Sequence, residues 1–303
     1  MAVPNLTAKE VEDLIPNCIV IGNALKGGQK LVYPCKINGE DLAVKFILLA
    51  DGIQYIDKNV MEEVVSTVAR AKREILTMNQ INSPHVVKLG SLQPELVNYN
   101  GQYLLYYTEE WIEGSSLADI ISQCGKLPYR EVIKLCLDVN KAISALQAVN
   151  KIHRDIKPAN IARRKETGEY VLLDMGLAFD LEDKSLTKAS FIVGTPSYFS
   201  PEQLNILNKR AMDFRSDIFS LGIVAYLAIS GVHPFYNNEN ITQEELMYNI
   251  AHKQVESLSD IDQSIPKEVS KVICRMLNKH PNQRFKSCAL LEKHLRKILP
   301  KEE

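Results

Sequence analysis

Apolar and polar positions alternate differently in the first and second parts of the chain. Across residues 19–46 and 103–112, β-branched and aromatic residues alternate with polar ones, as they do in half-buried strands. Between two such runs, Asn38-Gly39 is a strong signal for a tight hairpin turn. Before them, Thr7 and Glu10 have the spacing of a helix-capping box. We therefore expect a small antiparallel sheet in the first part.

The second part of the chain has the period of helices. A helix is predicted around residues 132–146, with one apolar face formed by Val132, Leu135, Cys136, Val139, Ile143 and Leu146. The longest apolar stretch, residues 218–229, is interrupted by Ser220 and Gly222 and is shorter than the roughly 20 residues that span a membrane. It predicts a buried helix. A long helical segment is also predicted in the first part, at about residues 58–81.

Composition narrows the class of protein. A chain of 303 residues with 46% hydrophobic and 24% charged residues forms one large domain or two lobes. Its net charge of −1 gives no reason to expect a nucleic acid or an acidic membrane as a partner. The six cysteines form no CxxC pair, which predicts free thiols in a reducing compartment. No apolar run opens the chain, so we expect a cytoplasmic protein without a signal peptide or membrane span.

Residues 153–160, His-Arg-Asp-Ile-Lys-Pro-Ala-Asn, place three side chains with different chemistry in one loop. Asp155 can accept a proton from a hydroxyl, Lys157 can neutralise a phosphate, and Asn160 can offer an oxygen to a divalent cation. The simpler interpretation is a polar surface loop that follows a helix. All eight positions, however, resemble the catalytic loop of the eukaryotic-type (Hanks-type) protein kinases, and the lysine is typical of their Ser/Thr branch.

Other segments resemble the same family in the same order. Residues 42–46 are similar to its Val-Ala-Ile-Lys strand, although a lysine on an edge strand is the alternative. Residues 174–176, Asp-Met-Gly, are similar to its metal-binding Asp-Phe-Gly. Residues 194–202 resemble the signature that closes its activation segment. The resemblance further implies that Asp217 braces the catalytic loop and that Arg284 pairs with Glu202.

The resemblance covers roughly residues 17–299 and implies an α+β, bilobal protein-kinase fold. A small antiparallel-sheet N-lobe with one main helix is expected over a mainly helical C-lobe, with ATP in the cleft. The expected divisions are an N-terminal extension (1–16), the N-lobe (17–112), the C-lobe (113–299) and a tail (300–303). The resemblance therefore leads us to expect one catalytic unit, with no obvious regulatory domain in this sequence.

The resemblance also assigns roles to residues. Asp155 is the expected catalytic base and Lys157 steadies the transferred phosphate, while Asn160 and Asp174 bind Mg²⁺, with Mn²⁺ as an alternative metal. Lys45 is expected to hold the α and β phosphates of ATP, with Glu74 as its partner. The other expected nucleotide contacts are Ile21, Gly22, Ala24, Gly27, Gly28, Ala43, Glu110 and Ile112. The glycine-rich match is weak because Ala24 replaces a glycine, so a plain hairpin stays open there.

Glu109 falls at the position that guards the back of the nucleotide pocket in this family. A charge at this position is unusual. Either its side chain points to solvent, or the alignment is offset by one residue, and the sequence alone does not decide between them.

Regulation is predicted from Arg154, a positive charge beside the catalytic Asp155 that suits a phosphate. We expect Thr187 or Ser190 to be phosphorylated by a second copy of the enzyme and to dock on Arg154, while Thr195 braces Asp155 and Lys157. In the alternatives, an acidic side chain fills the role or the loop is ordered without any anion.

The sequence thus predicts a Ser/Thr protein kinase that transfers the γ-phosphoryl group of ATP to hydroxyls of protein substrates. Two other functions stay open. A kinase-fold binding module with little activity would suit the weak glycine segment and Glu109. A small-molecule phosphotransferase would share the His-x-Asp pattern, but gives no reason for the set of Thr195, Glu202, Asp217 and Arg284.

Overall fold

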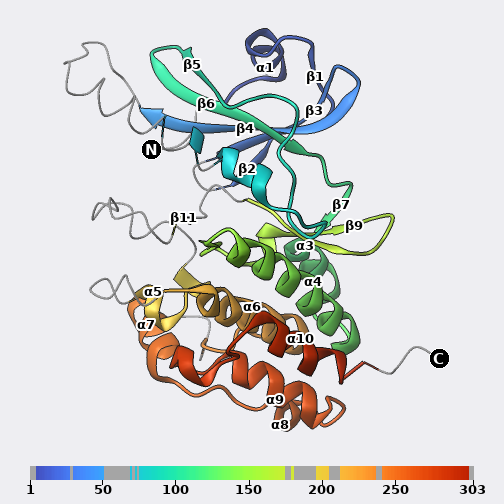
Figure 1. The fold of residues 1–303 in the computed structure, drawn as a ribbon, viewed down its shortest axis with the longest axis vertical. Helices are drawn as coiled ribbons and strands as arrows, with labels where there is room; N and C mark the ends of the chain where they lie inside the picture. The colour runs from blue at the N-terminus through green and yellow to red at the C-terminus, as the bar shows by residue number, and fades with distance from the viewer. Residues whose placement is uncertain are drawn as a thin grey trace. The chain divides into compact units, whose positions relative to one another are not determined.

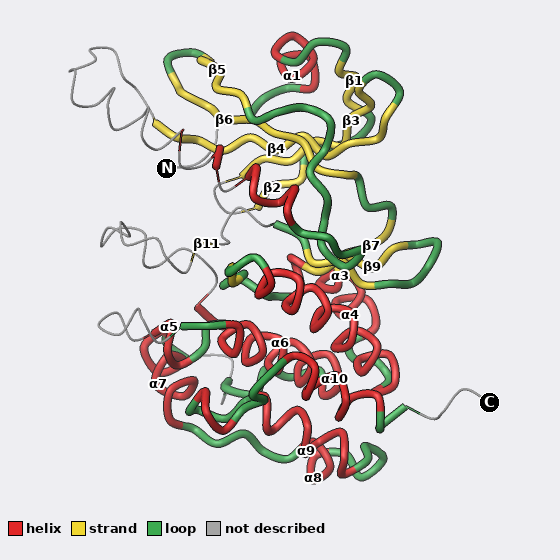
Figure 2. The backbone as a smooth tube through the Cα atoms, viewed as in Figure 1, coloured by secondary structure: helices red, strands yellow, loops and turns green. Residues whose placement is uncertain are grey.

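The computed structural model describes residues 5–27, 30–50, 69, 72–73, 75–174, 179–180, 196–204, 212–236 and 241–299, without the side chains of 26–27, 30, 48–50 and 179–180 (Figure 1). The chain divides into two compact units. The first comprises residues 1–80 and 87–112, and the second comprises residues 81–86 and 113–303. Strands dominate the first unit and helices the second, as the colours of Figure 2 show. The predicted α+β class is confirmed.

The first unit is built on one antiparallel sheet. Its strands are β1 (Cys18–Val20), β2 (Leu25–Gly27), β3 (Lys30–Ile37), β4 (Glu40–Ala50), β5 (Glu95–Tyr99) and β6 (Gln102–Glu110). They lie in the order β1-β3-β4-β6-β5, with β2 paired to β3. The predicted turn between β3 and β4 is confirmed, because Asn38 and Gly39 both have positive φ, 51° and 89°.

The helix α1 (Ala8–Leu14) begins with the predicted capping box: the Glu10 amide donates to the Thr7 hydroxyl, and the Glu10 carboxylate accepts from the Thr7 amide. Val11 and Ile15 pack into the core of the sheet unit together with Phe46 and Leu104. The residues before β1 therefore belong to this hydrophobic core. The predicted helix at 58–81 lies mostly outside the described residues; 69, 72–73 and 75–77 are helical, followed by the 3₁₀ turn η1 (Met78–Gln80).

The second unit is mainly helical. Its α-helices are α3 (Leu117–Cys124), α4 (Tyr129–Ala148), α5 (Pro201–Leu204), α6 (Phe214–Ser230), α7 (Gln243–His252), α8 (Leu258–Ile261), α9 (Lys267–Met276) and α10 (Cys288–Arg296). Its short strands are β7 (Gly114–Ser116), β8 (Lys151–Ile152), β9 (Ile161–Arg164), β10 (Tyr170–Leu172) and β11 (Phe179–Asp180). They form one sheet in the order β10-β9-β7 and one β8–β11 pair. The 3₁₀ turns are η2 (Pro158–Asn160), η5 (Pro196–Tyr198) and η7 (Pro281–Gln283).

Helix α6 lies at the centre of this unit, packed against α4 and α9. The prediction of a buried helix at 218–229 is confirmed, and so is the apolar face of α4, whose six predicted positions are all fully buried. Helix α6 ends at Gly231, whose φ of 78° is the left-handed conformation of a helix cap. All six cysteines are free thiols, as predicted. Among the described helices, none is both long and apolar enough to cross a membrane.

Candidate active site

Lys45 lies in the middle of the sheet of the first unit. Strand β4 is hydrogen-bonded to β3 on one side and to β6 on the other, so the alternative of an edge strand is wrong. The side chain of Lys45 is buried, and its Nζ lies 2.5 Å from the Oε2 of Glu109 on β6. A buried ammonium needs such a counter-ion.

Glu109 is itself buried, with 1% of its surface exposed, so the expectation that its side chain points to solvent is wrong. It lies directly opposite Ala43 across the β4–β6 ladder. Ala43, which the resemblance assigns to the nucleotide, therefore shares one face of the sheet with both Lys45 and Glu109, because side chains two residues apart on a strand point the same way.

The glycine-rich segment is described only in part. The amide of Ile21 donates to the carbonyl of Pro34 at 2.9 Å, and a Cβ on Gly22 would meet the Cγ of Pro34 at 2.8 Å. Close packing against Pro34 thus explains the glycine at position 22 by itself. Ala24 and the β2 residue Gly27 follow within the described residues. Whether this segment covers phosphates stays a prediction.

The end of β6 and the two residues after it use their backbone amides unequally. The amide of Glu110 donates to the carbonyl of Lys88 at 3.0 Å, and the amide of Lys88 donates to the Glu110 carboxylate at 2.9 Å. The amide of Ile112, by contrast, has no acceptor among the residues that the structure describes. Whether the amide of Ile112 binds the adenine of a nucleotide stays a prediction.

In the second unit, Asp217 on α6 holds the loop of residues 153–160 through two hydrogen bonds. Its two carboxylate oxygens accept the amides of His153 at 2.8 Å and Arg154 at 2.9 Å. Arg154 has a φ of 67°, a left-handed conformation that costs a non-glycine residue about 1 kcal/mol. Burial raises the pKa of the Asp217 carboxyl, and the hydrogen bonds from the amides of His153 and Arg154 oppose that rise. The predicted brace is confirmed.

The loop brings its three predicted functional side chains together. Lys157 Nζ donates to Asp155 Oδ2 at 2.7 Å, and Asn160 Nδ2 donates to the same oxygen and to the Asp155 carbonyl, each at 2.9 Å. Asp155 is buried, whereas Lys157 is partly exposed. Lys157 and Asn160, two residues of the same loop, therefore fix the orientation of the Asp155 carboxylate.

Asp174 directly follows Leu173, which is hydrogen-bonded to the same loop. The amide of Leu173 donates to the carbonyl of Asn160 at 2.8 Å, and the carbonyl of Leu173 accepts from the Nε2 of His153 at 2.9 Å. His153 carries its proton on Nε2, because its other ring nitrogen, Nδ1, accepts the amide of Asp155. Asp174 itself has a φ of 65°. The chain therefore places Asp174 next to Asn160, the other predicted metal ligand.

One carboxylate and one amide oxygen make an incomplete metal site. Within the described residues, no three His, Cys, Asp or Glu side chains are grouped so as to hold a metal ion. Magnesium in proteins is commonly bound by one or two carboxylates together with substrate phosphates and water. The pair Asn160 and Asp174 thus fits a cation that arrives with a phosphate ligand.

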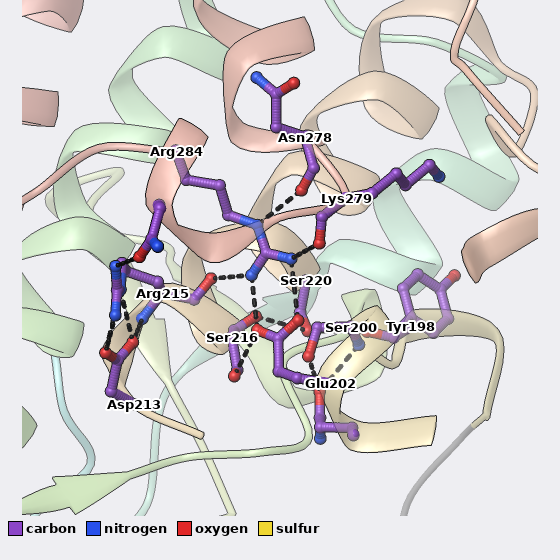
Figure 3. A network of polar contacts seen from close by, with 12 residues as sticks. Tyr198, Ser200, Glu202, Asp213, Arg215, Ser216, Ser220, Asn278, Lys279 and Arg284 are labelled. Atoms are coloured by element: carbon purple, nitrogen blue, oxygen red, sulfur yellow. Dashed lines mark hydrogen bonds and ion pairs between the residues drawn. The ribbon is translucent and has the colours of Figure 1, made fainter. Parts of the chain in front are cut away.

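The segment that ends at Glu202 is held in place by a buried arginine, Arg284 (Figure 3). Arg284 donates to both carboxylate oxygens of Glu202, at 2.6 and 2.9 Å, which confirms the predicted pair. Its remaining donors go to three backbone carbonyls, those of Arg215, Asn278 and Lys279. Every N–H of this guanidinium therefore has a partner, and the arginine is a structural support.

The structure adds Gln203, which the sequence reasoning missed. Its Oε1 accepts the amide of Ser200 at 2.9 Å, and its Nε2 donates to the carbonyl of Arg154 at 2.9 Å. One side chain thus joins the segment that contains Ser200 to the loop of residues 153–160. The sequence signal was only its position directly after Glu202, because a glutamine at the start of a short helix is ordinarily a surface residue.

Five predicted site residues lie outside the described residues: Gly28, Glu74, Thr187, Ser190 and Thr195. Their roles, including the docking of a phosphate on Arg154, stay predictions.

The family model for the protein kinase domain matches residues 26–295 of this chain. A probable serine/threonine-protein kinase of Clostridium perfringens is 28% identical over 277 residues, 90% of this chain and 37% of its own length. Probable PknB of Bifidobacterium longum is 35% identical over 173 residues, 55% of this chain and 24% of its own length. PknB of Mycobacterium leprae is 27% identical over 230 residues, 76% of this chain and 36% of its own length.

The chain spans between about a quarter and two fifths of the length of these three relatives. The domain match nevertheless covers most of the chain, and it runs through both units, from β2 to α10. The chain belongs to the protein kinase family.

Proposed function

We propose that this chain is an ATP-dependent serine/threonine protein kinase that phosphorylates protein hydroxyls. The observation that carries the proposal is the arrangement of Asp155, Lys157 and Asn160. Asp174 directly follows Leu173, whose amide donates to the Asn160 carbonyl. The names of the three relatives support the same class of reaction and acceptor. A binding module without activity would not need this set of charged groups held so closely.

Each residue has a role in this proposal. Asp155, oriented by Lys157 and Asn160, accepts the proton of the acceptor hydroxyl, and Lys157 steadies the transferred phosphoryl group. Lys45 holds the α and β phosphates. Asn160 and Asp174 would hold Mg²⁺, which supplies positive charge against the phosphate oxygens when it is bound. Because the transferred group carries its charge on its oxygens, positioning and electrostatics supply most of the acceleration.

The test is phosphate transfer from labelled ATP to generic protein acceptors, with and without Mg²⁺, by the wild-type chain and by Asp155→Asn. The amide keeps the shape of Asp155 but cannot take the proton, so kcat should fall by about 10²–10⁴-fold while nucleotide affinity changes little. Asp260→Asn, an exposed position on α8, is the matched control and should transfer phosphate normally.

Three outcomes separate the candidate functions. Transfer by the wild type that Asp155→Asn abolishes supports the proposal. Binding of ATP without any transfer indicates a binding module. Near-normal transfer by Asp155→Asn refutes the role given to Asp155.

A further inference from the structure

The ion pair between Lys45 and Glu109 joins two buried side chains on neighbouring strands. Lys45 is opposite Tyr107 in the β4–β6 ladder, and Glu109 is two residues beyond Tyr107 on the same strand. The pair is therefore a diagonal contact between neighbouring strands, on the sheet face that also carries Ala43. Both partners are buried, and the 2.5 Å separation of Nζ and Oε2 is that of a direct, charge-assisted hydrogen bond.

The second oxygen of Glu109 stands out. Oε1 is buried and accepts no hydrogen bond from any residue that the structure describes. A buried carboxylate oxygen without a donor is destabilising, and such groups are rare in folded proteins. Glu109 therefore does not fit the pattern of a simple structural support, in which both oxygens are satisfied, as they are in Asp217.

Lys45 is also the residue to which the proposed function assigns the α and β phosphates, and the inference rests on that assignment. An ammonium group has three donors, so Lys45 can contact more than one anion. Its attraction to a phosphate is nevertheless reduced by a carboxylate already at contact distance, because the two anions repel each other across the same cation.

We propose that Glu109 is a resident counter-ion of Lys45 with which the phosphates of the nucleotide compete. Glu109 neutralises the buried ammonium when no phosphate is near, and it weakens the binding of nucleotides in proportion to the charge of their phosphates. Glu109 is thus a positioning and affinity-setting residue that acts through Lys45. It does not take part in phosphate transfer itself.

The competition separates ligands that carry phosphates from those that do not. Glu109→Gln keeps the shape of the side chain and removes its charge. ATP should bind this variant at least about tenfold more tightly, the low end of what close charge pairs contribute in protein interfaces. Adenosine, which has the base and sugar but no phosphate, should bind wild type and variant with affinities within about twofold. Isothermal titration calorimetry measures both ligands under the same conditions.

Two further variants test whether the effect of Glu109 runs through Lys45 and is specific to this face of the sheet. In the Lys45→Met background, Glu109→Gln should raise ATP affinity less than it does with Lys45 present, because no ammonium is left for which the two anions compete. Glu95→Gln removes a charge from β5 at a position opposite Tyr106, which points to the other face of the sheet, and should leave ATP affinity unchanged. If Glu109→Gln does not fold, Glu109→Met offers an apolar side chain of similar length.

The outcomes are distinct. Weaker ATP binding by Glu109→Gln would mean that Glu109 holds Lys45 in place for the phosphates, and an equal change for ATP and adenosine would mean that Glu109 shapes the base pocket; either result overturns the competition. Unchanged ATP affinity overturns it as well. If the wild type and the variant both bind adenosine and ATP without any dependence on Lys45, the proposed nucleotide role of Lys45 fails instead.

Discussion

Replacing Arg284 with methionine should destabilise the second unit severely. The guanidinium is fully buried and makes five hydrogen bonds, two to the Glu202 carboxylate and three to backbone carbonyls. Methionine has a similar length and no donor. The change would leave the carboxylate of Glu202, whose side chain is 7% exposed, without this cation.

The expected cost follows from that burial. Breaking a buried ion pair by removing one partner costs about 3–5 kcal/mol, because the remaining charge is uncompensated. The three carbonyls lose charged donors as well, and these losses overlap with the first and do not simply add. Since a domain is stable by only about 5–15 kcal/mol, Arg284→Met should remove a large fraction of the free energy of unfolding.

Urea unfolding at 25 °C, followed by far-ultraviolet circular dichroism, measures this loss. Arg296→Met is the matched control: Arg296 pairs with Glu292 on α10 at 2.6 Å, but its side chain is 59% exposed, so its loss should cost at most about 0.5 kcal/mol. The double variant Arg284→Met/Glu202→Met should recover part of the lost stability, since it removes the unpaired carboxylate. A loss for Arg284→Met as small as that of the control would refute this reasoning.

Two other predictions concern the same unit. Burial lowers the pKa of His233 to about 4 from 6.5, so the unfolded chain binds a proton that the folded chain refuses, and stability falls as the pH drops through 6.5 towards 4. The loss should be about 2 kcal/mol between pH 8 and pH 5, and His233→Phe should remove it from the unfolding profile; an unchanged profile would contradict this. Gln203→Ala removes both hydrogen bonds that link Ser200 to Arg154, and should lower kcat/KM for the protein acceptor about tenfold. The KM for ATP should stay constant; an equal change in the KM for ATP would argue against a role of Gln203 in binding the protein acceptor.

Much of the fold was predictable because its signals are local. The hairpin at Asn38-Gly39 needs two adjacent residues with positive φ, and asparagine followed by glycine supplies them. Helix α4 has an apolar face at the helical period, and residues 218–229 of α6 are a mostly apolar run. The pairing of Arg284 with Glu202 was predictable for a different reason: both residues sit in short motifs whose partnership the family resemblance implies.

The surroundings of Glu109 were not predictable. Its contact with Lys45 depends on the register between β4 and β6, which lie more than fifty residues apart in the chain. A one-residue shift would turn Glu109 to the other face, and no feature of either strand alone fixes that register. The packing of α1 against the sheet is a similar case, because its capping box predicts where the helix begins but not what its apolar side covers.

The buried charged side chains of this protein differ in how completely they are paired. That difference distinguishes side chains that support the fold from one that can respond to a ligand. Asp217 accepts a hydrogen bond on each oxygen, and every donor of Arg284 has a partner, so neither side chain keeps a buried polar atom unsatisfied. Glu109 keeps one buried oxygen without a donor in the described part of the chain. A group that is buried at a cost and left incompletely satisfied is where binding of another ion can change the energy most. For this reason the charge of Glu109, and not that of Asp217 or Arg284, is expected to be coupled to the nucleotide.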